Sequence, residues 1–234
     1  MLIDFHAHSK GISKCCKIDG KDMVLLTKNS GMDGVILTNH YDKSYLINND
    51  AIEFANRYVN EYYYVKKQGE NIDFKVFFGI EVTMAKHNNI HMLIYGVDPS
   101  FVVNNPALYD LKIDQLSNLV HENGGVLVQA HPFRKGIDVL VDLKCLDGVE
   151  VNCHPLYDNT HVDKLSKIAK ENGLLLTCGG DFHNDTHRPT CGVYLSDSLK
   201  DCKEIITYLK KQKCIELCVQ EVDELKSYKY IFNK

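Results

Sequence analysis

Histidines and acids recur in this chain directly after short apolar runs. Six such runs end in side chains that can bind a metal ion or move a proton: His6 with His8, His40, Glu81, His131, His154, and Asp181 with His183. Imidazole nitrogens and carboxylate oxygens together suit zinc, manganese or iron, without choosing among them. Ligand-type side chains repeated at strand ends predict a metal cluster on the C-terminal face of a barrel.

The strongest local pattern is the segment from Asp4 to His8, which reads DFHAH. Because successive residues of a strand face opposite sides, His6 and His8 point the same way from the strand end, close enough to share one ion. Taken alone, the pair could equally be two surface imidazoles on an edge strand. The other ligand-type residues at strand ends favour the metal interpretation.

The elements that must position these residues alternate between strands and helices, which predicts a parallel α/β fold. Strands are expected near residues 2–5, 34–38, 75–82, 91–97, 125–130, 147–152, 174–178 and 192–195. Helical periodicity is expected over residues 20–30, 44–67, 107–122, 137–144, 160–171 and 199–212. The charged stretch 220–234 is uninformative beyond allowing a final helix.

Length and composition suit one barrel domain over residues 1–234, with 220–234 as a charged C-terminal tail. No apolar stretch approaches the ~18 residues of a membrane span and the start lacks a signal peptide, so a cytoplasmic protein without a membrane partner is expected. The nine cysteines are expected to be mostly buried free thiols. A net charge of -4 provides no basic stripe, which argues against long nucleic acid and favours a small anionic substrate. The oligomeric state is not indicated.

A series of motifs resembles the PHP (polymerase and histidinol phosphatase) family of metal-dependent phosphoesterases. They are DFHAH at 4–8, LTNH at 37–40, GIEVT at 79–83, HMLIYG at 91–96, QAHP at 129–132, GVEVN at 148–152 and GGDFH at 179–183. The match covers most of the chain. It implies a distorted seven-stranded (β/α) barrel, similar to a TIM barrel.

The resemblance also implies two or three divalent metal ions, of zinc, manganese or iron. The first ion would be held by His6, His8, Glu81 and Asp181. The second would be held by Glu81, His91 and His131, with the Glu81 carboxylate bridging the two ions.

A third ion would use His40 and His183 with one more ligand from the loop after the first motif. Neither Ser13 nor Lys14, where that ligand usually falls, can supply it. Three outcomes stay open: Cys15 or Cys16 provides a thiolate, Asp19 reaches into the site, or the third site is weak or empty.

Substrate-binding residues are expected on the loops beyond the metal ligands. Arg134 follows His131, and its guanidinium could bind two phosphate oxygens. The other candidates are His154, His187 and Arg188. Catalysis is expected to depend on Glu81, Asp181 and His183, and either His183 or His187 could protonate the leaving group.

These expectations combine into a function. The chain would hydrolyse a small phosphomonoester, of the nucleotide, sugar phosphate or histidinol phosphate type, by attack of a hydroxide held between two metal ions ~3.5–4 Å apart. The loop that lacks the usual ligand weakens the case for histidinol phosphate. The alternatives are a non-catalytic metal-binding scaffold, and hydrolysis of an amide, a cyclic ester or a short nucleic-acid phosphodiester.

Overall fold

A computed structural model describes residues 1–234 except 89, 135–138, 157–158, 187–189 and 222–225. The strands are β1 (Leu2–Ala7), β2 (Gly34–Leu37), β3 (His40–Tyr41), β4 (Lys75–Met84), β5 (Ile90–Tyr95), β6 (Val126–Gln129), β7 (Gly148–Asn152), β8 (Leu175–Gly179), β9 (Gly192–Tyr194), β10 (Cys214–Gln220) and β11 (Ser227–Asn233). The α-helices are α1 (Gly20–Asn29), α2 (Ala51–Glu70), α3 (Ser100–Asn104), α4 (Ile113–Glu122), α5 (Val162–Asn172) and α6 (Cys202–Lys211). Three 3₁₀ helices cover Lys43–Tyr45, Leu108–Asp110 and Leu143–Cys145.

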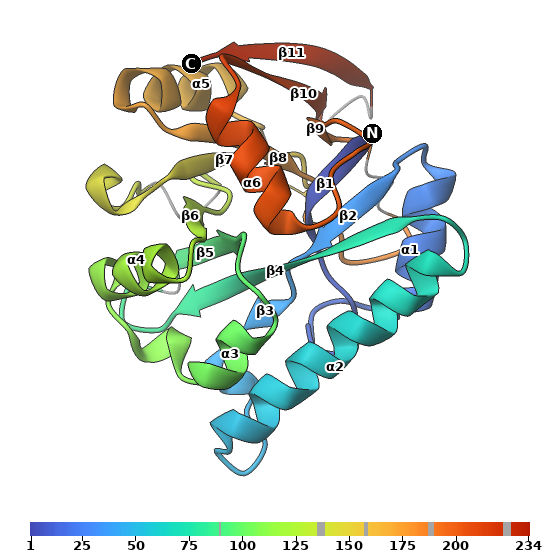
Figure 1. The fold of residues 1–234 in the computed structure, drawn as a ribbon, viewed down its shortest axis with the longest axis vertical. Helices are drawn as coiled ribbons and strands as arrows, with labels where there is room; N and C mark the ends of the chain where they lie inside the picture. Colours follow the sequence, from blue (N-terminus) through green and yellow to red (C-terminus); the bar gives the residue numbers. More distant parts are fainter. Residues whose placement is uncertain (89, 135–138, 157–158, 187–189, 222–225) are drawn as a thin grey trace.

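The strands form one sheet that curves into a nearly closed barrel, with helices on its outside (Figure 1). The barrel order is β1-β2-β4-β5-β6-β7-β8, and β9, β10 and β11 extend the sheet from β1 as antiparallel neighbours. Phe182, just after β8, forms a bridge with Ala7 of β1 and narrows the remaining gap. The predicted TIM-like barrel is therefore confirmed.

The sheet is mixed, whereas the alternating pattern predicted a parallel one. β5 runs antiparallel to both β4 and β6. Only a short turn separates Met84 from Ile90, and a parallel strand would need a crossover of a dozen residues or more. As a result, the first residues of β5 lie at the same end of the barrel as the last residues of β4.

Two expected helices begin later than predicted. α2 begins at Ala51 because Asn48 and Asn49 have positive φ angles, of 51° and 59°, and the Asp50 side chain then caps the helix. α4 begins at Ile113, after a separate 3₁₀ turn. Over 137–144, residues 137 and 138 lie outside the described part, and the remainder has only the 3₁₀ turn ending at Cys145.

The expectation of a final helix after residue 220 is wrong. β11 pairs with β10 along its whole length, and neither strand was predicted. Tyr228, Tyr230, Ile231 and Phe232 are residue types that favour strands over helices. Phe232 is buried, so the outer strand contributes to the core.

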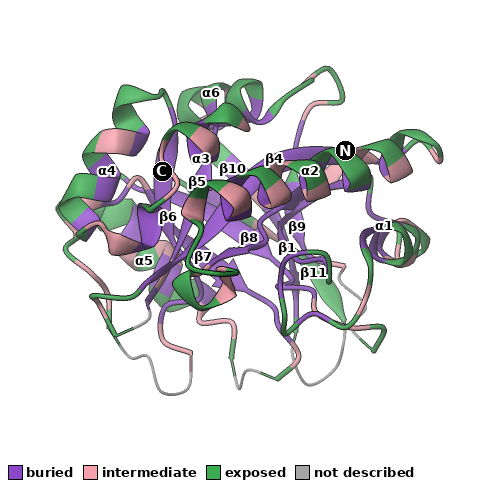
Figure 2. Ribbon diagram, turned by 90° about the horizontal axis from the view of Figure 1, so that it is seen from below, coloured by how far each residue is buried: buried purple, intermediate pink, exposed green. Residues whose placement is uncertain are grey.

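The helices each bury one side against the barrel, and the barrel strands are buried almost throughout (Figure 2). In α2, Phe54, Tyr58 and Val65 fall on the buried face at helical spacing. The Tyr58 hydroxyl donates to the backbone oxygens of Asn39 and Gly79, which ties this helix to the chain beside the metal ligands.

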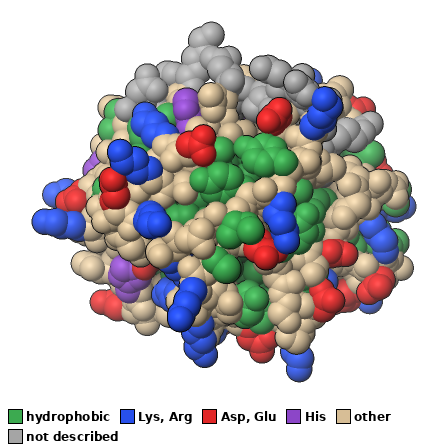
Figure 3. All heavy atoms as spheres, turned by 90° about the horizontal axis from the view of Figure 1, so that it is seen from above, with side chains coloured by type: hydrophobic (Ala, Val, Ile, Leu, Met, Phe, Trp, Pro, Cys, Tyr) green, Lys and Arg blue, Asp and Glu red, His purple; other side chains and the backbone are tan. Residues whose placement is uncertain are grey.

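On the face seen from above, Lys, Arg, Asp and Glu side chains are interspersed around a central group of hydrophobic ones (Figure 3). Among the residues that the structure describes, no helix combines the length and the apolar character needed to cross a membrane.

Candidate metal centre

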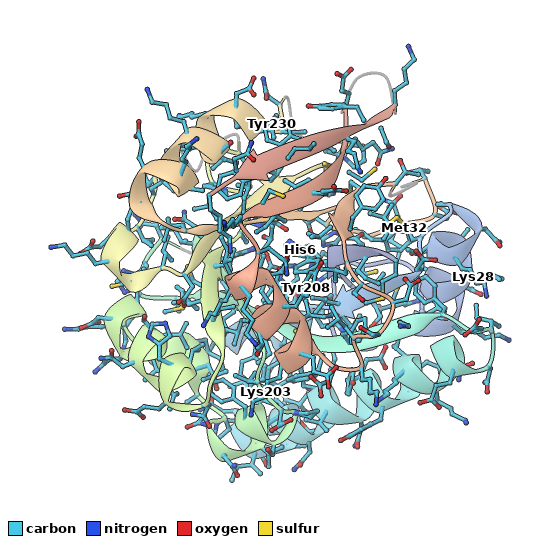
Figure 4. The ribbon with its side chains drawn as sticks, turned by 45° about the horizontal axis from the view of Figure 1, so that its top comes forward. His6, Lys28, Met32, Lys203, Tyr208 and Tyr230 are labelled. Carbon is cyan, nitrogen blue, oxygen red and sulfur yellow. The ribbon has the colours of Figure 1, made fainter. Side chains whose placement is uncertain are left out.

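The predicted metal ligands come together at one end of the barrel. They are His6 and His8 at the end of β1, His40 in β3, Glu81 in β4, His91 at the start of β5, His131 after β6, and Asp181 and His183 after β8. All are buried except His91 and His183, which are partly buried. His6 lies in the middle of the molecule, enclosed by the barrel strands (Figure 4).

The Glu81 carboxylate stands at the centre of the cluster. Its Oε1 lies 2.8 Å from His91 Nδ1, 3.0 Å from His131 Nε2 and 3.4 Å from His6 Nε2. Its Oε2 lies 2.7 Å from His40 Nδ1 and 3.4 Å from His8 Nε2. Each carboxylate oxygen therefore faces a different group of imidazoles, as a carboxylate that bridges two cations must.

Asp181 contacts the same two histidines as Glu81, His6 and His8. Its Oδ1 lies 3.0 Å from His8 Nε2 and 3.5 Å from His6 Nε2. Both Nε2 atoms thus face two carboxylates, and the two side chains point the same way from the end of β1, as the alternation predicted. The arrangement matches a donor set for one divalent ion.

His40 reaches the cluster through a strand that the sequence did not predict. β3 pairs in parallel with β4, and His40 lies opposite Glu81 in this register. The His40 ring stacks on His8 with centroids 4.4 Å apart, and His183 lies 4.4 Å from His8 on a tilted ring. His8, His40 and His183 place ring nitrogens within 4.8 Å of one another.

The protonation states of Glu81, Asp181 and His8 suit metal binding. Burial would raise the pKa of Glu81, but the positive charges of its neighbours, led by His40, hold this pKa well below its ordinary value. Burial would also raise the pKa of Asp181, but the charge of His6 and a hydrogen bond with His8 hold it well below its ordinary value. Burial lowers the pKa of His8, and the charges of two other histidines lower it further. Ionised carboxylates and a neutral imidazole are the forms that coordinate metals. Despite burial, nearby carboxylates raise the pKa of His6 well above its ordinary value, and Glu81 and Cys15 raise that of His40 to about 10, so a bound cation would displace protons from these two imidazoles.

Glu150 of β7 supports the ligands and was not predicted as a site residue. Its buried carboxylate accepts hydrogen bonds from His6 Nδ1 at 2.8 Å, from the His131 backbone N–H at 2.8 Å and from Asn152 Nδ2 at 3.0 Å. A proton on His6 Nδ1 leaves Nε2 with its lone pair toward the cluster. The indication in the sequence was an acid in the middle of an apolar strand, within the motif GVEVN.

The backbone around the cluster is strained and closely packed. His131 and Asp181 both have positive φ angles, of 30° and 51°, which are uncommon for non-glycine residues. Gly179 lies against β1, and a Cβ there would meet His6 Cβ at 2.5 Å. Asp4 Oδ1 accepts hydrogen bonds from the backbone N–H groups of His6 and Gly180, which joins β1 to the segment that bears Asp181.

The donor atoms fit divalent metal ions. His6 Nε2 and Glu81 Oε2 are buried and have no hydrogen-bond partner among the described residues, although His40 Nδ1 lies 2.7 Å from that oxygen. Buried polar atoms left without partners are costly, and several converging here indicate a ligand that the protein itself does not supply. Divalent cations satisfy this set of imidazole and carboxylate donors, and the set does not identify the metal.

The three residues proposed to complete a third site make different contacts in the loop after β1. Cys15 Sγ lies 3.1 Å from His183 Nε2. Cys16 instead donates its thiol to the backbone oxygens of His8 and Ile18. Asp19 is the N-cap of α1, so its carboxylate is engaged there.

The electrostatic surroundings of the two thiols differ. Burial would raise the pKa of the Cys15 thiol, but hydrogen bonds with His183 and His40 outweigh this effect and lower the pKa to about 6. Burial raises the pKa of Cys16 to about 11. Cys15 is therefore the thiol that can be a thiolate at neutral pH.

A cavity of about 470 Å³ opens beside the cluster. Arg134 and His154, both predicted to bind substrate, contribute to its lining, together with His40, His91, His131, Asp181 and His183. His154 also places a ring nitrogen within 4.8 Å of donor atoms of Asp181 and His183. His187 and Arg188, the other predicted substrate residues, lie outside the described residues.

Comparison with solved structures supports the fold. One similar structure is a two-domain protein from Bacteroides vulgatus that contains a predicted PHP-like metal-dependent phosphoesterase; the TM-score is 0.68 and the identity 16%, over 94% of this chain and 64% of the other. A second is a putative metal-dependent phosphoesterase from Bifidobacterium adolescentis, with a TM-score of 0.58 and 16% identity over 88% of this chain and 94% of that one. A third is an amidohydrolase from Chromobacterium violaceum with bound sulfate and no metal, with a TM-score of 0.55 and 14% identity over 90% and 96% of the two chains.

No family model matches the chain, and no curated protein matches it either. At these identities the likeness establishes the fold. The chain has a PHP-like barrel fold. The predicted resemblance is thereby confirmed at the level of structure, and the activity must be argued from the site. This chain spans slightly less than two thirds of the Bacteroides protein, so the activity of that whole protein is no more than a basis for a proposal.

Proposed function

We propose that this protein is a metal-dependent hydrolase of small phosphomonoesters. The observation that carries the proposal is the buried Glu81 carboxylate, which has imidazoles at both oxygens and shares His6 and His8 with the Asp181 carboxylate. The fold shared with proteins named as metal-dependent phosphoesterases supports it.

The ligand sets are those that the resemblance implies, and the contacts of Glu81 with these histidines support them. His6, His8, Glu81 and Asp181 would hold one divalent ion, and Glu81, His91 and His131 a second. When bound, such ions polarise a phosphate ester and make a water nucleophilic at neutral pH. Elemental analysis of the purified chain would identify these ions as zinc, manganese or iron.

The other residues prepare the site for that chemistry. Glu150 would accept the proton of His6 Nδ1 in a hydrogen bond, which leaves Nε2 to bind an ion. Arg134, which contributes to the cavity, would bind phosphate oxygens through its guanidinium. His183, beside Asp181 at the cavity, would face the leaving oxygen, where charge develops in the transition state.

The size and chemistry of the cavity favour a small substrate. A volume of about 470 Å³ suits a small ester. Its described lining includes the cationic side chains Lys17 and Arg134, which suit an anion. A nucleotide, a sugar phosphate and histidinol phosphate all belong to this class.

The test is phosphate release from a panel of phosphomonoesters, with manganese or zinc added. The native chain is compared with His6→Ala and with His121→Ala, which removes an exposed imidazole on α4. We expect metal-dependent release by the native chain and by His121→Ala, and none by a folded His6→Ala. Equal, negligible release by all three would contradict the proposal.

Amide hydrolysis is the second candidate, because one similar structure is named an amidohydrolase. The same bound ions could act on a carbonyl. Release of ammonia or amine from a panel of amides by the native chain, without phosphate release from the esters, would favour it.

A further inference from the structure

The loop after β1 is held firmly on both sides of Cys15. The backbone N–H of Cys16 donates to the Ser13 oxygen at 2.9 Å, and that of Ser13 donates to the Ser9 oxygen at 3.0 Å. The Lys17 N–H donates to the His183 oxygen at 2.9 Å. The loop is therefore fastened to the same segment that carries His183, and the position of the Cys15 side chain follows from this anchoring.

The Cys15 thiol lies against two imidazoles of the cluster. Its Sγ is 3.1 Å from His183 Nε2, and His40 is close enough to contribute to the lowered pKa of the thiol. All three side chains contribute to the cavity beside the metal cluster. Side chains from three separate segments thus line the same edge of the site.

The neighbouring loop residues are engaged elsewhere. Ser13 Oγ donates to Asn39 Oδ1 at 2.9 Å and accepts from the His40 backbone N–H at 3.0 Å. Lys14 Nζ donates to the backbone oxygen of Ser44. The Cys16 thiol and the Asp19 carboxylate bond to backbone atoms, as described above.

We propose that Cys15 is a thiolate ligand that completes, with His40 and His183, a third metal position at this site. The inference rests on the proposed function, because it concerns an additional ion of the same centre. A thiolate with two imidazoles suits zinc and disfavours manganese and magnesium, which prefer oxygen ligands. This chain would therefore differ in metal preference at one position from a site completed by a carboxylate.

The separation between Cys15 and His183 is close to that of two ligands of one zinc ion. Zinc binds sulfur at about 2.3 Å and imidazole nitrogen at about 2.0–2.1 Å, which places these atoms about 3.5 Å apart in a tetrahedral site. The observed separation between Cys15 Sγ and His183 Nε2 is 3.1 Å. Cys15 is exposed, so its side chain has room to move outward by this amount. A His183 that binds an ion in this way would not serve as the proton donor for the leaving group.

The test uses the full chain loaded with cobalt(II), because a thiolate bound to cobalt(II) gives a charge-transfer band in the near ultraviolet. The native chain is compared with Cys15→Ser, with Cys15→Asp and, as the matched control, with Cys16→Ser. We expect the band in the native chain and in Cys16→Ser. It should be lost in Cys15→Ser, together with part of the bound metal, whereas Cys15→Asp should retain the metal without the band.

Two results would overturn the inference: no band in the native chain, or a band that persists in Cys15→Ser. The first would mean that the thiol and imidazoles pair with each other and bind no ion, and the second that the band comes from another thiolate, such as one of Cys153, Cys178 and Cys191. Phosphate release is measured on the same samples. Hydrolysis by a native chain that lacks the band would reject Cys15 as a metal ligand and support the proposed function. A band without hydrolysis would support Cys15 as a ligand and contradict the proposed function.

Discussion

Replacing Glu150 with glutamine tests the claim that this carboxylate sets the metal affinity of the site. The substitution keeps the size of the side chain and removes its charge. The carboxylate accepts from His6 Nδ1 at 2.8 Å and from the His131 backbone N–H at 2.8 Å through its two different oxygens. A carboxamide has only one oxygen, so its NH₂ group must face a donor at one of these positions.

The expected magnitude follows from the role of such partners. Loss of a carboxylate that orients a ligating histidine typically lowers metal affinity about 10- to 100-fold, or about 1.4–2.7 kcal/mol. We expect Glu150→Gln to reach the upper part of this range, because it disturbs two ligands at once, His6 of β1 and His131 after β6.

The assay is competition for zinc against a chromogenic chelator, with circular dichroism to confirm folding. Glu216→Gln is the matched control, because Glu216 is also a strand residue but is partly exposed on β10, where it pairs with Lys229. A folded Glu150→Gln that binds zinc as tightly as the native chain would refute the reasoning. An equal loss in both variants would refute it as well.

Three further predictions concern packing, reactivity and substrate binding. Gly179→Ala should lower the free energy of unfolding by about 1–3 kcal/mol and weaken metal binding, because its Cβ would press on His6. Gly173→Ala, at φ 66° in open space, should lower the free energy of unfolding by about 1 kcal/mol without affecting metal binding. Chemical denaturation and zinc titration measure the two effects, and similar metal affinities in the two variants would argue against the packing account. In metal-free protein, the alkylation rate of Cys15 should rise with pH and reach half its maximum near pH 6, because the reactive thiolate forms as the pH passes the lowered pKa. Cys16, whose pKa is raised to about 11, should stay unlabelled at neutral pH. An alkylation rate for Cys15 that rises only near pH 9 would contradict this. Arg134→Ala should raise KM for a phosphomonoester about 10-fold or more, because charged hydrogen bonds worth about 1.5–3 kcal/mol are lost. Arg134→Lys should have an intermediate KM. An unchanged KM in steady-state kinetics would show that Arg134 does not bind the substrate.

The sequence predicted much of the cluster because alternation along a strand is a local property. His6 and His8 share one side of β1, as two residues separated by one must. Glu81, His131 and Asp181 follow buried apolar runs, and the ends of neighbouring strands meet in a barrel.

Other parts of the site depend on pairing that no local pattern determines. The reversed direction of β5 brings His91 to the cluster from the start of its strand, and the two-residue β3 brings His40 opposite Glu81. Glu150 supports the cluster by accepting hydrogen bonds from His6 and from the His131 backbone, and both residues are far from Glu150 in the sequence.

The loop after β1 illustrates the same limit. From the sequence, Cys15, Cys16 and Asp19 were equivalent candidates for a third site. Hydrogen bonds to backbone atoms remove Cys16 and Asp19 from this role, and those bonds arise only once the loop has folded. The strands near the C-terminus were missed because charged residues dilute their apolar pattern, and the pairing of β10 with β11 stabilises them.

The most direct test of the central claim is the metal content of the purified chain before and after Glu81→Gln, with circular dichroism on each sample. Because both oxygens of Glu81 face separate groups of histidines, we predict that the native chain binds more than one divalent ion and that a folded Glu81→Gln loses most of this metal. A native chain that is folded but binds no zinc, manganese or iron would contradict the account, as would a Glu81→Gln variant with unchanged metal content.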